Sequence, residues 1–257
     1  MTALVLLEWT VGWVAVAAWS QSWDVITRGH FRITAWGGLL LGVAAGYAVF
    51  LALQGLTDAS ITKGLVVGGA VLLVGFLAVQ YSNTDLPGVV VGSLVGLFGL
   101  YLLFDISAYI DGWHQVLAWS HLTVGALVLG GVTNGMMLGH WYLNQPGLKP
   151  WALARLTMLS LVACGASLVF GLATVSTLAS ASTDGAAMGI QGFGQDFGVF
   201  FYGIWVALVA FTGAIVWMAR RCIQIRSIQS ATGLYYVAIL TAGVAEFVLR
   251  YLMVNAP

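Results

Sequence analysis

The sequence predicts an all-α protein, a polytopic membrane bundle of about eight transmembrane helices with both termini outside. Three observations support this fold class. The 257-residue chain is 60% hydrophobic and only 7% charged, whereas about a quarter of the residues in a soluble domain are charged. It contains eight apolar segments long enough to cross a bilayer, which takes about 20 residues each. Basic residues are also concentrated in alternate connections, as the positive-inside rule describes.

The eight segments follow one another with mostly short connections, so consecutive helices should be antiparallel neighbours in one domain, 1–257. The first segment is apolar like a signal peptide, but it lacks a basic start and contains Glu8, so we predict a retained span. Several segments carry glycines four residues apart, a spacing that lets helices approach closely in lipid. The predicted spans are 3–20, 36–55, 64–82, 87–105, 115–139, 152–180, 198–219 and 232–254.

The connections differ in charge, and this difference predicts the orientation. Basic residues lie in or beside the first, fifth and seventh connections, while acidic residues with a single lysine, Lys63, occupy most of the others. The third connection has no basic residue. The positive-inside rule therefore places the odd connections in the cytoplasm and both termini outside. The basic residues are Arg28, Arg32, Lys149, Arg155, Arg220, Arg221 and Arg226, and the acidic ones are Asp58, Asp111, Asp184 and Asp196.

Composition also excludes several kinds of site. The formal net charge is zero, which leaves no electrostatic footprint for nucleic acid. The two cysteines, Cys164 and Cys222, lie within or at the end of apolar spans and form neither a disulfide framework nor a metal motif. No CxxC, HExxH, phosphate-binding loop or nucleophile elbow occurs in a usable context. We therefore predict membrane lipid as a partner, no nucleic acid, and no metal of the protein's own.

Five ionisable residues from four predicted spans share one depth near the outer face: Glu8, Asp105, His121, Glu246 and Arg250. Ionisable groups at membrane depth are costly and mark either a functional site or a structural pair. Oxidation of a quinol removes two protons, so a histidine or carboxylate must lie near each hydroxyl. A purely structural alternative stays open, because Glu246 and Arg250 are spaced as a favourable helical ion pair and His121 could simply bond a neighbouring helix.

A second polar cluster lies at the inner side, in the stretch 131–151. It contains His140 in the sequence GHWYL, and we place His140 near any chemical site on this side. In the alternative interpretation, His140 only complements the carbonyl end of its helix, and Trp141 and Tyr142 are interfacial anchors. A haem b between His140 and His30, which we place in a loop, is an alternative that we do not favour.

The final span, TAGVAEFVLRYLM at 241–253, resembles the last helix of the quinol-binding membrane anchors of molybdenum oxidoreductases, the DMSO reductase anchor and polysulfide reductase (NrfD-like) subunits. In that helix of the family a Gly or Ala, an acid and an Arg-Tyr or similar pair recur, which correspond here to Glu246 and Arg250. The helix number, the chain length and the outside termini agree with the family. The resemblance implies menaquinol or ubiquinol binding near the outer face, with electrons passed to an extracytoplasmic iron–sulfur subunit.

We therefore expect a multi-pass subunit of an electron-transfer complex in a bacterial cytoplasmic membrane, at most the quinol-oxidising subunit of an oxidoreductase. Its partners would be other subunits, such as iron–sulfur or cytochrome proteins, on the outer face. We expect His121, Glu246 and Arg250 to be catalytic, and Glu8, Asp105 and His140 to contact the cofactor, a menaquinone or ubiquinone.

Two other functions stay open. The first is a structural subunit that scaffolds a larger complex, with paired buried charges and with the connection at 180–196 as a docking surface or a flexible loop. The second is a small-molecule transporter, against which the sequence shows no inverted repeat. The segments GHWYL at 139–143 and RSIQSATGLYYVA at 226–238 point to no activity.

Overall fold

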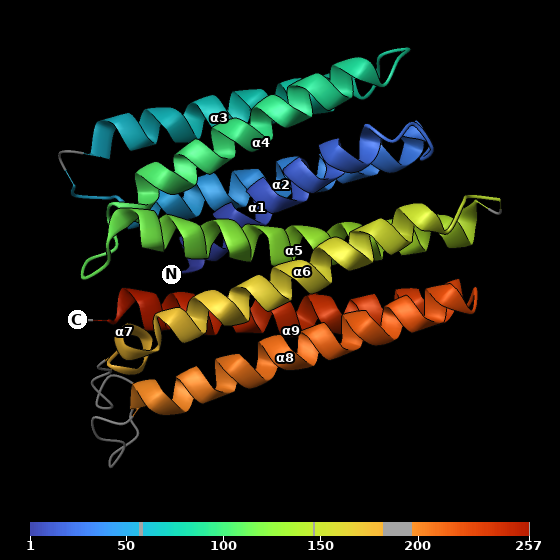
Figure 1. Cartoon of the computed structure of the whole chain (residues 1–257). Coiled ribbons are helices and arrows are strands. Elements are labelled where there is room, and N and C mark those ends of the chain that lie inside the picture. Colours follow the sequence, from blue (N-terminus) through green and yellow to red (C-terminus); the bar gives the residue numbers. More distant parts are fainter. Residues whose placement is uncertain (57–58, 146, 182–196, 257) are drawn as a thin grey trace.

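In the computed structural model, which describes residues 1–56, 59–145, 147–181 and 197–256, long helices run side by side (Figure 1). Eight helices of these ranges are long and apolar enough to cross a membrane, which confirms the predicted all-α polytopic bundle. A short helix, α7 (Val175–Ala179), follows the sixth of them. The eight are α1 (Thr2–Gln21), α2 (Arg28–Ala52), α3 (Ser60–Val79), α4 (Leu86–Ser107), α5 (Gln115–Asn144), α6 (Trp151–Ala173), α8 (Phe197–Gln224) and α9 (Ile228–Val254).

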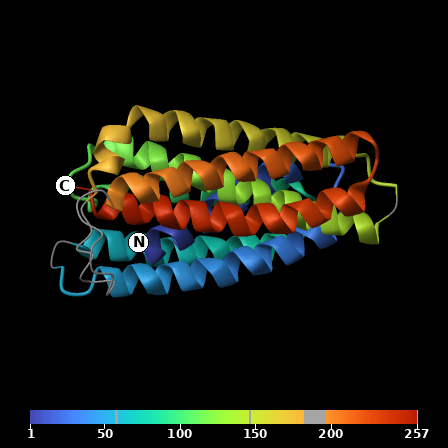
Figure 2. The same ribbon diagram turned by 90° about the horizontal axis from the view of Figure 1, so that it is seen from below.

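Both chain termini lie at the same end of the bundle, on the left in Figures 1 and 2. We call this end the terminal end, and the opposite one the far end. That the terminal end faces the outer, non-cytoplasmic side of the membrane stays a prediction from the distribution of basic residues. The predicted docking connection, 180–196, lies outside the described residues from 182 onward.

Two helix boundaries differ from the prediction by more than five residues. Helix α2 begins at Arg28 rather than at 36, so His30 lies in its first turn and not in a loop. The prediction was wrong because the first turns of α2 are polar but have partners inside the protein. The buried His30 ring packs against Phe31 and Trp141, at 5.1 and 5.9 Å between ring centroids. Helix α6 ends at Ala173 rather than at 180, because the chain leaves helical geometry at Thr174 before α7 begins.

The eight long helices form two units of four. Helices α1 to α4 pack in a ring, each against the next and α4 against α1, and α5, α6, α8 and α9 pack in the same way. The units meet where α1 packs on α5, with α4 on α5 and α9 on α1 flanking this contact. Both units begin at the terminal end (Figure 1). This is the arrangement of a parallel repeat related by an axis along the membrane normal.

Short matching runs at equivalent helical positions support the repeat. Thr10-Val11-Gly12 begins eight residues after Thr2, the first residue of α1, and Thr123-Val124-Gly125 begins eight residues after Gln115, the first of α5. In the second helix of each unit, an Arg-Ile-Thr run from Arg32 matches an Arg-Leu-Thr run from Arg155, each starting four residues into its helix. The contacts and these runs favour a parallel repeat of two four-helix units, which differs from the inverted repeat that the sequence lacks.

The two units touch backbone to backbone where α1 crosses α5. A Cβ atom added to Gly12 would overlap the carbonyl group of Ala126, and one added to Gly130 would overlap the backbone of Gly12. Helices in lipid associate through such close contacts, because no hydrophobic driving force brings them together there. Glycine at these positions therefore sets the distance between the units.

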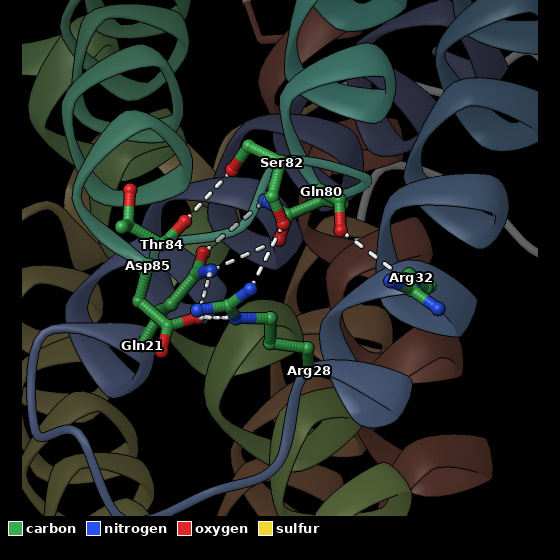
Figure 3. Close-up of polar contacts among 7 residues, drawn as sticks. All are labelled: Gln21, Arg28, Arg32, Gln80, Ser82, Thr84 and Asp85. Carbon is green, nitrogen blue, oxygen red and sulfur yellow. Dashed lines mark hydrogen bonds and ion pairs between the residues drawn. The ribbon is translucent and has the colours of Figure 1, made fainter.

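Polar contacts tie α1 and α2 to the connection between α3 and α4 at the far end (Figure 3). The buried side chains of Gln21 and Gln80 exchange hydrogen bonds of 2.9 and 3.2 Å. Arg28 forms an ion pair of 3.2 Å with Asp85, and Arg32 Nε donates to the Gln80 carbonyl at 3.2 Å. The third connection thus has no basic residue of its own but is bound by two arginines of α2.

Substitution of Gly12 by Ala should lower the thermal unfolding temperature in a mild detergent, because the added methyl group forces α1 away from α5. Overpacking of this kind costs about 1–3 kcal/mol. The matched control is Gly75→Ala in α3, where an added Cβ meets nothing within 4 Å. Equal unfolding temperatures for the two variants would contradict the proposed role of the α1–α5 contact.

Candidate functional site

Three charged side chains meet inside the bundle: Glu8 from α1, and Glu246 and Arg250 from α9. All three are 0% exposed. The guanidinium of Arg250 lies 2.6 Å from Glu8 Oε2 and 2.9 Å from Glu246 Oε2, both measured from Nη2. Because α1 and α9 belong to different units, this charged cluster lies at the contact between the units.

The remaining donors of Arg250 are also used. Nε donates to Glu8 Oε2 at 3.0 Å, Nη2 donates to the backbone carbonyl of His121 at 3.0 Å, and Nη1 lies 2.9 Å from Met253 Sδ. The His121 carbonyl brings α5 into the same network. A single guanidinium therefore connects α1, α5 and α9.

Gly125 provides the space for this cluster. A Cβ atom at this position would overlap Arg250 Nη2 and would lie 2.6 and 2.7 Å from the Oε2 atoms of Glu246 and Glu8. Gly125 is the counterpart of Gly12 in the repeated Thr-Val-Gly run. Gly12 leaves room for the backbone of α5, whereas Gly125 leaves room for three charged groups. Sequence reasoning missed Gly125, although its place in the repeated Thr-Val-Gly run is a signal that could have identified it.

The cluster contains two carboxyl groups but one cation. Glu8 Oε1 and Glu246 Oε1 are buried and have no hydrogen-bond partner among the described residues. An unpaired charge in a low-dielectric interior is strongly unfavourable. The cluster is electrically neutral only when one of the two carboxyl groups holds a proton, and the two free Oε1 atoms are places where that proton can reside.

A cavity of about 270 Å³ opens at the terminal end, one helical turn from the charged cluster. Leu4 lines the cavity on α1 and precedes Glu8 by four residues, and Val254 lines it on α9 and follows Arg250 by four. Residues four apart share a helix face and are separated by about 6 Å along the axis. The rest of the lining is mainly apolar and comes from Met1, Ala3, Val49, Ala52, Leu53, Leu56, Ile106, Tyr109 and Ile110.

Asp105 lies beside this cavity rather than in the charged cluster. The buried Thr62 hydroxyl donates to Asp105 Oδ2 at 2.5 Å and lies 3.0 Å from the Tyr109 hydroxyl. Tyr109 and Ile106 line the cavity. Asp105 is thus linked to the cavity wall through two hydroxyl groups, of Thr62 and Tyr109, neither of which sequence reasoning singled out.

The His121 ring is not a hydrogen-bonded member of the charged cluster but bonds to Thr174. Its Nε2 atom lies 3.0 Å from the Thr174 hydroxyl, which also donates to the Phe170 carbonyl at 2.8 Å where α6 ends. The ring packs edge-on against Trp113 and Phe170, at 5.4 and 5.9 Å between centroids. The backbone carbonyl of His121 accepts from Arg250, while its ring, which was predicted to be catalytic, has a structural partner in Thr174, the residue that follows α6.

His140 lies at the other end of α5, with an exposed side chain four residues before the helix ends. The structure therefore separates it from the other predicted site residues. His30, the second histidine of the haem alternative, is buried against Phe31 and Trp141. Within the described ranges, no group of three or more His, Cys, Asp or Glu side chains could hold a metal ion.

Comparisons with protein-family models, curated proteins and solved structures found no match for this chain. The resemblance to the quinol-binding anchors therefore stays a prediction from the sequence. Two of them, Glu246 and Arg250, are members of the charged cluster.

Replacement of Arg250 by Met should destabilise the protein by about 3–5 kcal/mol, because it leaves two buried carboxyl groups without a cation. Adding Glu8→Gln and Glu246→Gln to this variant should restore much of the loss, since the triple variant buries no ionisable group at this position. Thermal unfolding in detergent measures both effects, with Lys63→Met as a control for loss of a cation elsewhere. If the triple variant is no more stable than Arg250→Met alone, charge imbalance is not the cause.

Proposed function

We propose that the protein is an integral subunit of a bacterial membrane electron-transfer complex and that it binds quinol in the cavity at the terminal end. Partner subunits carrying iron–sulfur clusters or haems, docked at this end, would accept the electrons. In this proposal the quinol loses two protons and two electrons and leaves as quinone. The protein itself takes part in binding and in proton transfer.

One observation carries the proposal: an apolar cavity lies one helical turn from Glu8, a buried carboxyl group with an unpartnered oxygen. A quinol is uncharged and largely apolar, and its oxidation needs a base that it reaches directly or through one water. The cavity volume of about 270 Å³ is close to the lower end for small-molecule sites, about 300 Å³. It suits a ring headgroup, with the isoprenoid tail in lipid.

The side chains around the cavity take distinct roles in this proposal. Whichever of Glu8 and Glu246 is ionised accepts one proton, and Arg250 is a positioning residue that holds both carboxyl groups and stabilises the ionised form. On the cavity wall, Tyr109 hydrogen-bonds through Thr62 to Asp105 and offers a second acceptor to the other quinol hydroxyl. His121 supplies a carbonyl to Arg250, and a catalytic role for its ring stays a prediction.

Filling the cavity should weaken quinone binding. Ala52→Phe places a ring in the cavity from an exposed position at the end of α2, whereas Leu51→Phe alters an exposed neighbour that does not line it. We expect Ala52→Phe to raise the Kd of decylubiquinone about tenfold or more, equivalent to about 1.4 kcal/mol, with no change for Leu51→Phe. Quenching of tryptophan fluorescence in detergent measures the Kd. Unchanged binding in both variants would place the quinone elsewhere.

Loss of the proton acceptor should stop turnover without loss of the complex. In complexes purified from native membranes, Glu8→Gln should lower quinol oxidation about 100-fold or more, the usual effect of removing a general base. Asp111→Asn, which neutralises an exposed carboxylate in the connection before α5, is the control. Mass spectrometry of the co-purified subunits verifies assembly. Normal turnover by an assembled Glu8→Gln complex, or purification of the protein without redox subunits, would refute the proposal.

One structural observation favours a small-molecule transporter as a second candidate. In transporters built from parallel repeats, the substrate and coupling-ion sites lie at the contact between the repeats, and here the charged cluster lies at the contact between the units. Proteoliposomes containing the purified protein alone distinguish the two functions. Proton or solute flux that is lost in Glu8→Gln supports transport. Absence of flux together with quinone binding supports the electron-transfer subunit.

The scaffold alternative depends on the same contacts. Arg250 uses its donors within the protein, and this network alone would join the two units. A scaffold would lose stability in Arg250→Met. Its affinity for decylubiquinone, however, would be the same with and without Ala52→Phe. The cavity variants therefore separate a scaffold from a quinol-binding subunit.

A further inference from the structure

The far ends of the two units differ in charge. In the first unit, Arg28 is paired with Asp85 at 3.2 Å. A second acid, Asp24, lies in the connection between α1 and α2. The second unit carries five cations at its far end, and its sequence contains no Asp or Glu between Asp111 and Asp184 or between Asp196 and Glu246. Their charge is therefore not neutralised within that unit. The five are Lys149, Arg155, Arg220, Arg221 and Arg226.

Two of these cations line a shallow, open pocket on the surface of α8 near its end, which we call the α8 cavity. The cavity has a volume of about 230 Å³, and its walls are Trp217, Arg220, Arg221 and Gln224. The Arg221 guanidinium lies over the Trp217 ring, 5.1 Å from its centroid, and donates to Gln224 Oε1 at 3.2 Å. Arg220 Nη1 lies 3.7 Å from Met158 Sδ on α6. Both guanidiniums are held by neutral groups, so each keeps its full charge for a ligand.

The flank of this cavity is apolar. Trp217 is 50% exposed, Met218 47% and Ile225 77%. In a membrane protein such side chains at the end of a spanning helix face the boundary between acyl chains and headgroups. A ligand that fits here therefore has an anionic head beside an apolar body that stays in the bilayer.

We propose that this cavity, formed by Trp217, Arg220, Arg221 and Gln224, binds the phosphate headgroup of an anionic phospholipid. Arginine is suited to this ligand, because its planar fork of donors matches a phosphate group, and basic pockets at the membrane surface bind anionic headgroups. The lipid tails would cover Trp217 and Ile225. The proposal is independent of the quinol site, which lies at the terminal end.

Native mass spectrometry of the delipidated full-length protein with added phosphatidylglycerol or phosphatidylcholine tests this site. The first bound phosphatidylglycerol should bind more tightly than phosphatidylcholine. A basic residue at the membrane surface contributes about 1 kcal/mol, or about fivefold in affinity. Arg220→Gln combined with Arg221→Gln should therefore weaken phosphatidylglycerol binding by about 25-fold and leave phosphatidylcholine binding unchanged.

The matched control combines Lys149→Gln with Arg155→Gln. It removes the same charge from the same face of the second unit but leaves the cavity intact. We expect a loss of about fivefold or less in this variant, and unchanged unfolding temperatures verify that both double variants are folded. Equal affinities for the two lipids would overturn the proposal, because the protein would then not distinguish an anionic headgroup. Equal losses of phosphatidylglycerol affinity in the two double variants would also overturn it, because any basic residues at this end would then attract the lipid equally well.

Discussion

The Arg250 guanidinium is the interaction on which the arrangement of the two units depends. It is fully buried, and it binds a carboxyl group from α1, a carboxyl group from its own helix and a backbone carbonyl from α5. A buried cation requires such partners, since the surrounding apolar helices offer none. The first helix of each unit and the last helix of the second unit are therefore held at one point, and the glycines at the α1–α5 crossing bring that point within reach.

Sequence reasoning predicted the depth of the charged residues well, because position along a helix follows directly from the residue number. Glu8, Glu246 and Arg250 share a depth, and they meet. It could not predict direction around the helix axis in the same way. Asp105 and His121 have a similar predicted depth, but Asp105 is bonded to Thr62 on α3 and the His121 ring is bonded to Thr174 at the end of α6.

The pairing of the two units explains why the direction of each side chain around its helix axis was hard to predict. Which helices are neighbours depends on how the two units pair, and the sequence signs of that pairing are only a few residues long, such as the Thr-Val-Gly runs from Thr10 and Thr123. Apolar composition alone predicts eight spans equally well for many pairings. The boundaries of the helices were predicted to within about five residues, except at the start of α2, where the buried His30 lies within the helix, and at the end of α6, where Thr174 leaves helical geometry.

Equivalent positions of the two units now carry different chemistry. Glu8 lies six residues after the first residue of α1, and His121 lies six residues after the first residue of α5. A symmetric dimer of identical four-helix chains would have to place the same residue at both positions, so two acids or two histidines would face the pair of contacts. Joining the copies in one chain removes this restriction. One unit can place an ionisable side chain against an arginine while the other uses its ring for packing, an asymmetry that a homodimer of identical four-helix chains could not encode.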